Sequence, residues 1–324
     1  MDTPKITLRP FNIETDAARY AELVNTIVPD PIDEARAREW YTNFPADGVR
    51  YRVVAVDERG EIVGSGEASR RPNNVPGTFF IEPIVLPEHR RRGIGAMLYD
   101  DAVEFACAHG ANRFICEVRD DMPEWFKFAQ ARGFEIDRHI FESTLDLKIF
   151  DESKFAGVIE AVQAQGIRFT SLAEVGDTEA NRRKLHEVNK LAALDIPGFE
   201  GEFPRFEDFS KYVFQASWFR ADGQILAVDG ERFVGLGAVG YFPTTNSADN
   251  MHTGVLKEYR GRKIALAIKL LTIRYARALG ATFIRTNNDS KNAPILAINR
   301  KLGYKPAPGW YKWAKGINIA PALK

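Results

Sequence analysis

The stretch VLPEHRRRGIGAML, residues 85 to 98, decides how the rest of the sequence is interpreted. An apolar run ends at Val85, and Pro87 then prevents a strand from continuing along a sheet. Three arginines and two glycines follow, just before a segment whose apolar residues have helical spacing. The first N–H groups of a helix lack partners within the helix, and the positive end of the helix dipole lies there. The stretch is therefore predicted to bind a phosphate or diphosphate group.

The glycines and arginines of this loop narrow down the anion. Gly93 and Gly95 leave out side chains where the backbone must approach a ligand closely. Arg90, Arg91 and Arg92 would add charge-assisted contacts to a diphosphate. Neither the dinucleotide fingerprint G-x-G-x-x-G nor the loop G-x-x-x-x-G-K-[ST] is present. The ligand is therefore predicted to carry a nucleotide-type pyrophosphate that is held without either motif.

The two halves of the chain resemble each other. Three stretches of the first half recur in the second half in the same order: VAVDERGEIVGSGEA (54–68) as LAVDGERFVGLGAVG (226–240), VLPEHRRRGIGAML as VLKEYRGRKIALAI (255–268), and ARGFE (131–135) as KLGYK (301–305). Arg90 and Arg260 are separated by 170 positions, and so are Gly133 and Gly303. Two copies are too few for a solenoid, so the pattern predicts the duplication of one domain.

Each copy has the same predicted order of elements. A strand (6–10 in the first copy) precedes helical stretches, a hairpin, a strand ending at Val85 or Val255, the loop, an amphipathic helix, a short strand, a further helix and a last strand. This order predicts an α/β (α+β) fold with a mixed sheet flanked by helices in each copy. We expect one domain over 1–150 and another over 151–324, with a connecting helix at 152–165.

Composition places the chain among ordinary globular proteins. Lys+Arg and Asp+Glu both number 44 among 324 residues, so no overall basic field would attract nucleic acid. The first residues lack a signal peptide pattern, and no apolar run approaches the ~20 residues of a membrane helix. We therefore expect a cytoplasmic protein without membrane or nucleic-acid partners. Cys107 and Cys116 lie in apolar stretches and are expected in the core.

The loop V-x-P-x-x-R-x-x-G-x-G resembles the coenzyme A loop of the GNAT superfamily of N-acetyltransferases, and IVLPEHRRRGIGAMLYDDAV (84–103) matches that pattern at every anchor. NAPILAINRKLGY (292–304) is similar to the later motif of that family. The resemblance covers most of both halves and implies two tandem GNAT domains with largely antiparallel sheets. It also implies that acetyl-CoA, the acyl donor, contacts a loop in each half: Val85, Arg90, Arg91, Arg92, Gly93, Ile94, Gly95 and Ala96 in the first, and Val255, Arg260, Gly261, Arg262, Lys263, Ile264 and Ala265 with Asn292 in the second.

The chain departs from the family pattern in both copies. In the second loop Lys263 stands at the first glycine position, where it either blocks the pyrophosphate or supplies another cation. We expect this helix start to need only a negative φ, which a lysine adopts readily. The tyrosine that many members place four residues before the distal glycine is replaced by Ala129 and Asn299. Met122 stands opposite Asn292, so the first copy has the better loop and the second the better distal motif.

Acetyl transfer to an amine needs a general base. Glu82 and His252 each lie three residues before the valine that ends the strand, and both are candidates. Glu117 on the following strand is a weaker candidate. His252 is the preferred base, in the second half, because an unperturbed imidazole has a pKa of ~6.5. An insertion at 194–209, rich in acidic and aromatic residues, is either an acceptor-binding loop or an ordinary surface loop.

The resemblance implies an enzyme that moves an acetyl group from acetyl-CoA to a primary amine of a small molecule or peptide, by direct transfer and without a metal. The backbone N–H of Val85 or Val255 would polarise the thioester carbonyl. The missing tyrosines leave two alternatives open. The protein could be a non-catalytic acyl-CoA-binding protein, or one half could be catalytic and the other its structural partner.

Overall fold

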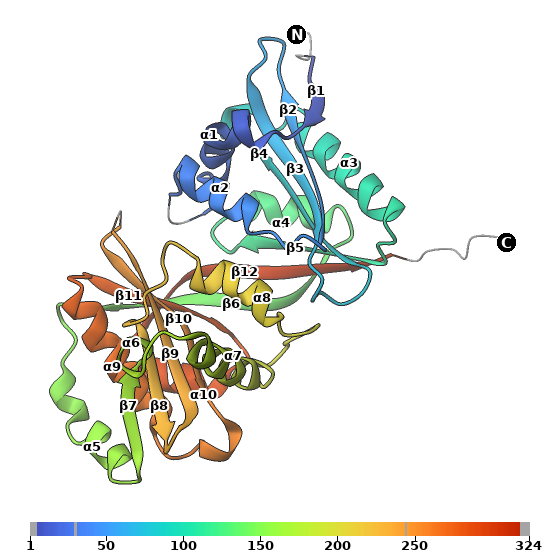
Figure 1. Cartoon of the computed structure of the whole chain (residues 1–324). Helices are drawn as coiled ribbons and strands as arrows, with labels where there is room; N and C mark the ends of the chain where they lie inside the picture. The colour runs from blue at the N-terminus through green and yellow to red at the C-terminus, as the bar shows by residue number, and fades with distance from the viewer. Residues whose placement is uncertain (1–4, 29–30, 244, 318–324) are drawn as a thin grey trace. The chain divides into compact units, whose positions relative to one another are not determined.

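A computed structural model of the chain describes residues 5–28, 31–243 and 245–317. They form two compact units, shown in Figure 1. Unit 1 comprises the described residues up to Arg138, Glu200–Glu202, and those from Trp310 onward. Unit 2 comprises His139–Phe199 and Phe203–Gly309. None of the helices in the described ranges is long and apolar enough to cross a membrane.

Unit 1 contains a mixed sheet in the order β1-β2-β3-β4-β5-β12, with helices on both faces. Its strands are β1 (Thr7–Pro10), β2 (Val49–Val56), β3 (Ile62–Arg70), β4 (Thr78–Val85), β5 (Arg113–Arg119) and β12 (Lys305–Gly316), and its helices are α1 (Ile13–Val24), α2 (Glu34–Thr42), the short 3-10 helix η1 (Pro87–His89), α3 (Ile94–Ala108) and α4 (Pro123–Gln130). Asn12 starts α1 by accepting a hydrogen bond from the N–H of Glu14. The buried Leu23 of α1 packs with Val54 and Ile84 on one face of the sheet.

Helix α3 covers the opposite face of the sheet in unit 1. Gly64 and Gly66 of β3 allow this close packing, because a Cβ atom on either would come within 3.0 Å of Leu98 of α3. The same device recurs in unit 2, where a Cβ on Gly235 or Gly237 would meet Ile268 at 2.9 and 2.4 Å. The glycines that the two halves share in sequence are therefore packing positions between strand and helix.

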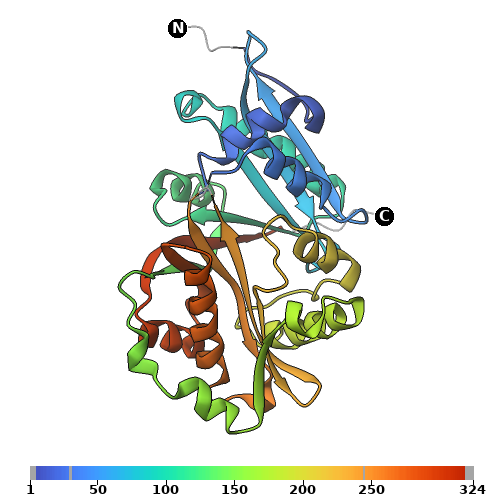
Figure 2. The ribbon, with the colours of Figure 1, turned by 60° about the vertical axis from the view of Figure 1, so that its left-hand side comes forward.

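Unit 2 repeats the architecture with the strand order β7-β8-β9-β10-β11-β6. Its strands are β7 (Ile167–Ser171), β8 (Gln224–Asp229), β9 (Arg232–Phe242), β10 (Ser247–Val255), β11 (Phe283–Asp289) and β6 (Glu135–Asp146), and its helical elements are η2 (Glu152–Phe155), α5 (Val158–Gln163), α6 (Leu172–Val175), α7 (Glu179–Ala193), α8 (Phe206–Phe209), the π-helical turn η3 (Ser210–Phe214), η4 (Lys257–Tyr259), α9 (Ile264–Ala278) and α10 (Ala293–Leu302). In Figure 2, α9 and α7 lie on opposite faces of this sheet. The predicted fold class, with a mixed, largely antiparallel sheet flanked by helices in each copy, is confirmed.

The two central strands of unit 1 separate after a short parallel pairing. Strand β4 pairs with β5 only at Thr78, Phe79 and Phe80, although β4 continues to Val85 and β5 to Arg119. In unit 2, β10 and β11 pair only from Ser247 to Asp249 of β10. Each unit therefore has a gap between its central strands, and this gap opens toward the loop that follows β4 or β10.

The last strand of each unit comes from the other half of the chain. Strand β12 pairs with β5 from Trp310 to Gly316, and β6 pairs with β11 from Ile140 to Asp146. The expected division at 150 and 151 therefore differs from the structural units, because sequence order alone assigns β6 to the first half. Trp313 of β12 is 1% exposed in the core of unit 1.

The connecting helix expected at 152–165 is not continuous. The structure has η2 and the six-residue helix α5 there, separated by Gly157 with a φ of 77°. A residue in the left-handed region interrupts the helical hydrogen bonds. Phe155, Ile159 and Val162 point into the core of unit 2, so this segment is part of that unit.

Candidate active site

The loop between β4 and α3 leaves several backbone N–H groups free. Gly93 precedes α3 with a φ of 81°, and Arg91 is also left-handed at 61°. Among the described residues, no acceptor takes the N–H groups from Arg92 to Gly95. A Cβ placed on Gly93 would have nothing within 4 Å, so open space lies before these donors. Free N–H groups at the positive end of a helix fit a phosphate group.

Arg90 does not extend into this open space. Its Nε donates to the carbonyl oxygen of Val85 at 3.0 Å, and its guanidinium lies 5.4 Å from the ring centre of Trp125. Arg260 repeats the contact, with Nε 3.1 Å from the carbonyl oxygen of Val255. These two arginines thus make a structural contact, and their expected role as ligand contacts stays a prediction. Each ties its loop to the end of the preceding strand.

In unit 2 most of the predicted coenzyme A residues surround one cavity. This cavity has a volume of about 530 Å³, and its lining includes Thr253, Gly254, Val255, Arg260, Gly261, Lys263, Ile264, Ala265, Leu266, Asn292 and Lys301. Arg262 lies elsewhere, because it donates to the side chain and the carbonyl oxygen of Gln165. Arg260, Lys263 and Lys301 give the lining three cations against Asp195, which pairs with Arg260 at 2.7 Å. An anionic ligand fits this lining.

Lys263 corrects the expectation about the start of the second helix. Its φ is 63°, so the helix begins with a left-handed residue as in the first copy. A lysine pays a steric cost there that a glycine does not. The glycine of this loop has moved to Gly261, with a φ of 78°, at the position that Arg91 occupies in unit 1.

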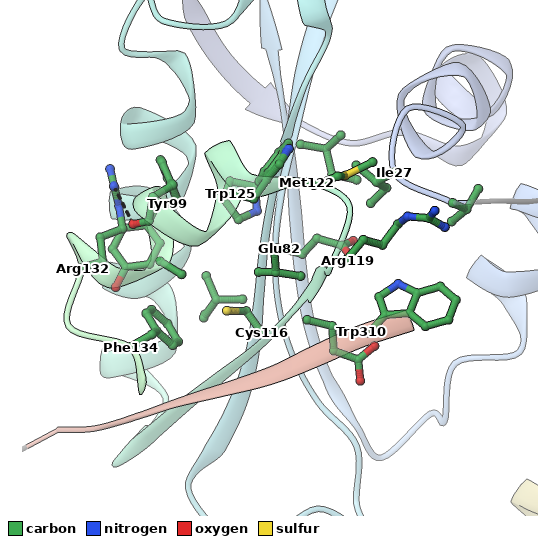
Figure 3. Close-up of a pocket in the computed structure, with 18 residues that line it drawn as sticks. Ile27, Glu82, Tyr99, Cys116, Arg119, Met122, Trp125, Arg132, Phe134 and Trp310 are labelled. Atoms are coloured by element: carbon green, nitrogen blue, oxygen red, sulfur yellow. Dashed lines mark hydrogen bonds between the residues drawn. The ribbon is translucent and has the colours of Figure 1, made fainter. Parts of the chain in front are cut away.

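Unit 1 has a cavity of about 290 Å³ in the gap between β4 and β5 (Figure 3). Its lining comes from both faces of the sheet: Ile81, Glu82, Pro83 and Ile84 of β4, Cys116, Glu117, Val118 and Arg119 of β5, Ile27, Val28, Tyr99, Met122, Trp125, Phe128, Ala129, Arg132 and Phe134 from the helices and the loops beside them, and Trp310. Tyr99 and Phe134 lie toward one end, and Ile27 and Trp310 toward the other. The cavity thus passes between the strands.

Glu82 lies in the middle of this cavity. Burial raises the pKa of Glu82 to about 7, and the negative charges of Glu67 and Glu117 act in the same direction, while Arg52 opposes them. A carboxylate with a pKa near 7 exists in both protonation states at neutral pH. Such a group is suited to take up and release a proton.

The backbone of β4 beside Glu82 also faces the gap. Leu86 donates its N–H to the carbonyl oxygen of Val63 on β3. Because hydrogen-bonded and non-bonded pairs alternate in an antiparallel ladder, the N–H of Val85 points away from β3, toward the gap. Pro83 occupies the other position of β4 whose backbone nitrogen faces the gap. A proline has no N–H to donate, and none is needed there for pairing with β3. Leu256 and Val255 repeat this arrangement in unit 2.

Comparison with known proteins agrees with this geometry. Residues 16–134 match the Acetyltransferase (GNAT) family. The first half of the chain therefore contains a GNAT domain. The chain is 24% identical over 287 residues to a mycothiol acetyltransferase of Saccharomonospora viridis, covering 84% of this chain and 83% of that relative.

Two solved structures have the same fold over almost the whole chain. A tandem GNAT protein from the clavulanic acid biosynthesis pathway is 19% identical with a TM-score of 0.74, covering 98% of this chain and 100% of the other. A GCN5-related N-acetyltransferase from Sphaerobacter thermophilus is 19% identical with a TM-score of 0.68, and 98% of each chain is covered. These likenesses show that both units adopt the GNAT fold.

His252, the preferred base in the sequence, lies in a less suitable environment than Glu82. Burial lowers the pKa of His252 to about 4, and its Nε2 has no hydrogen-bond partner among the described residues. A Cβ on Gly254 would lie 2.6 Å from that nitrogen, so His252 packs against the strand backbone. His252 is absent from the lining of the unit 2 cavity.

The insertion at 194–209 has no single role. Asp195, Ile196 and Pro197 line the unit 2 cavity. Glu200 belongs to unit 1, where it pairs with Arg113 at 2.7 Å. Phe203, Phe206 and Phe209 of the insertion instead pack in or against the core of unit 2, with Phe209 3% exposed. They do not form the aromatic acceptor surface that the composition suggested.

Two other details differ from the sequence-based expectations or were missed by them. Cys107 is exposed, because the buried face of α3 is formed by Tyr99, Ala102 and Ala106. The charged partners of Glu82, Arg52 and Glu67, were missed as well. The alternation of polar and apolar residues in RYRVV and GSGEAS was the available signal, but finding it needed the strand register. Among the described residues, no group of three or more His, Cys, Asp or Glu is placed to hold a metal ion.

Proposed function

We propose that this GNAT protein transfers the acetyl group of acetyl-CoA to a primary amine of a small molecule or peptide, and that the transfer takes place in the gap of unit 1. The observation that carries the proposal is Glu82, a carboxylate with a pKa raised to about 7 that lines a cavity between the separated strands. The mycothiol acetyltransferases among the relatives support acetyl transfer to a small molecule.

The residues of unit 1 fit acetyl-CoA in three places. The free N–H groups from Arg92 to Gly95 would hold its pyrophosphate. Apolar side chains such as Trp125 and Phe128 line the way into the gap. The N–H of Val85, which points toward the gap, would donate to the thioester oxygen as negative charge develops there. Bound acetyl-CoA supplies an activated acyl group.

Glu82 would act as the general base toward the acceptor. An amine attacks a carbonyl carbon only after it has lost its extra proton, so the acceptor ammonium must first be deprotonated. With a pKa of about 7, Glu82 takes this proton at neutral pH and passes it to solvent. The preference for Glu82 over His252 reverses the order suggested by the sequence. It follows from the environments of the two side chains.

Unit 2 is proposed as a second coenzyme A-binding unit rather than the catalytic one. Its cavity lies along the loop and is lined by Lys263, Lys301 and Asn292, which suits a diphosphate and a polar chain. The imidazole of His252, with a pKa of about 4, would be a weak base at neutral pH. For unit 2 we thus retain the alternative that it binds acyl-CoA without catalysing a reaction.

Steady-state release of coenzyme A with a panel of primary amines tests the proposal. Glu82→Gln should lower kcat by ~10²–10⁴-fold, which is typical for a lost general base, while coenzyme A still binds. His252→Gln is the matched variant and should change kcat far less. The opposite pattern would place the reaction in unit 2, and no release of coenzyme A with any amine would remove the proposed activity.

The pH profile gives a second readout of the same base. Glu82 must be ionised to accept a proton, so kcat/KM should fall as the pH drops through about 7. Glu82→Gln should remove this acid limb. A profile in the wild-type protein that stays flat from pH 8 to about 5 would show that no group like Glu82 is required.

A further inference from the structure

Five charged side chains occupy one cross-strand row of unit 1. In the register of the strands, Arg52 of β2 is opposite Glu67 of β3, and Glu67 is opposite Glu82 of β4. Beyond the gap, Glu117 of β5 is opposite Lys312 of β12. Extending the pairing of Phe80 with Ile115 by two residues puts Glu117 level with Glu82. The row therefore runs across five strands, with three carboxylates between two cations.

The ends of the row hold its inner carboxylates in place. Arg52 donates from Nε to a carboxylate oxygen of Glu67 at 2.8 Å, and their side chains are only 10% and 11% exposed. The Arg52 guanidinium also lies 4.1 Å from the ring centre of Tyr20. At the other end Lys312 Nζ lies 3.3 Å from a carboxylate oxygen of Glu117. Each outer cation offsets one carboxylate, so one negative charge remains for the row.

The surroundings of Glu82 contain further titratable groups on the elements packed against it. Tyr20 comes from α1, and Cys116 and Arg119 come from β5. Burial raises the pKa of the Cys116 thiol to about 12, so it is neutral at physiological pH. Arg119 is engaged by Asp121 at 2.8 and 2.5 Å. Glu67 and Glu117 are therefore the negative charges that act on Glu82, and Arg52 opposes them.

The corresponding row of unit 2 lacks these charges. Its register places Gln224 opposite Ala238, and Ala238 opposite His252. Across the second gap, Asn287 is opposite Glu142. The positions of Arg52, Glu67 and Glu117 are thus occupied by Gln224, Ala238 and Asn287. The same sheet folds without the charged row, so the row is not a requirement of the fold.

We propose that Glu67 and Glu117 are positioning residues for Glu82, and that the row forms a subsite for the cationic nitrogen of the acceptor. This inference rests on the proposed function. The acceptor enters as an ammonium ion, whose charge balances the one uncompensated carboxylate of the row. Glu67, which is hydrogen-bonded to Arg52, raises the proton affinity of Glu82 through its adjacent negative charge.

The proton balance of the step follows from this arrangement. The Glu82 carboxylate takes one proton from the acceptor ammonium and later releases it to solvent. The amine nitrogen then forms a bond to the acetyl carbonyl carbon, and the carbon–sulfur bond breaks. The second nitrogen proton leaves with the sulfur as the thiol of coenzyme A. No oxidant or metal is needed.

Titration of the full chain with ¹³C-labelled glutamate tests the row without acceptor or acetyl-CoA. Glu82→Gln identifies the resonance of Glu82, whose midpoint should lie near pH 7. In Glu67→Gln this midpoint should fall by about one unit or more, because the adjacent negative charge is gone. Glu61→Gln, at an exposed carboxylate in the β2–β3 turn, is the control and should leave the midpoint unchanged. An unchanged midpoint in folded Glu67→Gln would overturn the proposal.

A second variant covers the case in which Glu67→Gln does not fold, since it leaves Arg52 buried without its carboxylate. Glu117 is 44% exposed, so Glu117→Gln should fold, and the Glu82 midpoint should again fall, by a smaller amount. A midpoint that does not move in Glu117→Gln would also contradict the row. In either variant the midpoint of Glu82 could move while the acid limb of kcat/KM stays in place. The row would then set the pKa of Glu82, but Glu82 would not be the general base. That outcome would contradict the proposed function and not the row.

Discussion

Lys263 occupies a backbone conformation that suits glycine. Its φ of 63° is stabilised only by the loop around it, because a left-handed residue with a side chain costs roughly 1–2 kcal/mol. Lys263→Gly should therefore raise the free energy of unfolding by about 1 kcal/mol, after the greater flexibility of glycine in the unfolded chain is subtracted. Urea denaturation of the ligand-free protein measures this difference.

Arg91→Gly is the companion variant in the first loop, with a φ of 61°. It should stabilise the protein by a similar amount. A loss of stability in both variants would show that the lysine and arginine side chains contribute more through their contacts than the backbone conformation costs.

Lys269 is buried in unit 2 without a hydrogen-bond partner for its Nζ among the described residues. Burial lowers its pKa to about 7 from 10.5, and the Nζ lies 4.7 Å from the ring centre of Tyr304. Between these two values the unfolded chain holds a proton that the folded chain does not, so folding is favoured as the pH rises from about 7 to 10.5. Below pH 7 Lys269 is protonated in both the folded and the unfolded chain, so the folded protein bears the full cost of burying its charge.

Lys269→Met should therefore raise the free energy of unfolding by about 1–4 kcal/mol at pH 7, as replacing buried charges by apolar groups often does. The gain should shrink as the pH rises toward 10.5, because wild-type stability recovers. Tyr304→Phe, which removes a buried hydroxyl from the same place, should give no such dependence between pH 7 and 9. Thermal unfolding at several pH values distinguishes the two. A gain from Lys269→Met that is constant over this range would argue against a neutral lysine.

At the scale of the element, the strand–loop–helix segment from β4 to α3 determines binding of the donor. Gly93→Glu would place a carboxylate in the open space before the free N–H groups, where a diphosphate is proposed to bind. We expect at least a tenfold loss of coenzyme A affinity at unit 1, which calorimetry can measure, because a like charge replaces an open anion site.

Gly60→Glu is the matched control for this variant. Gly60 has a φ of 84° and open space at its Cβ position, as Gly93 does, but it lies in the β2–β3 turn. The two variants carry the same backbone strain, so only Gly93→Glu should lose affinity. Equal affinity in both would contradict a phosphate site at this loop.

The sequence allowed this segment to be predicted closely because its determinants are local. The strand ends at Val85 and Val255, and α3 and α9 begin directly after Gly93 and Lys263, at the first glycine position of the loop pattern. Determinants that depend on register were not accessible in this way. The opposition of Glu67 and Glu82 exists only once two strands have paired, and the burial of His252 exists only in the folded protein.

The strand that each final strand pairs with could likewise not be predicted from the sequence. Strands β6 and β12 follow corresponding helices and correspond in sequence order, so nothing local indicates that each completes the other unit. Pairing choices between distant segments are set by tertiary packing, here by side chains such as Trp313 that fill a core made from the opposite half.

At the scale of the whole molecule, the exchanged strands make the halves of the chain interdependent. A fragment ending at residue 150 lacks β12, so β5 loses one of its two neighbouring strands and unit 1 loses Trp313 from its core. We expect this fragment, produced alone, to show no cooperative unfolding transition in calorimetry. A native-like transition of the isolated fragment would contradict this.

A cut made after folding should behave differently. Ile149 is 73% exposed, so a protease site inserted there would be accessible. Each of the two pieces would still supply a strand to a unit built from the other piece, so the cleaved protein should remain one species in gel filtration. Separation of the pieces under native conditions would show that the strand pairings are weak.

The exchange also sets the order in which the protein can be completed during its synthesis. Domains generally fold as units while the chain emerges, and the N-terminal one folds first. Here unit 1 needs Trp310–Gly316, which are translated after β11, the last strand of unit 2, has ended at Asp289. Unit 1, most of which is translated first, can therefore be completed only when its final strand has been made. Unit 2, which is translated second, is completed before it.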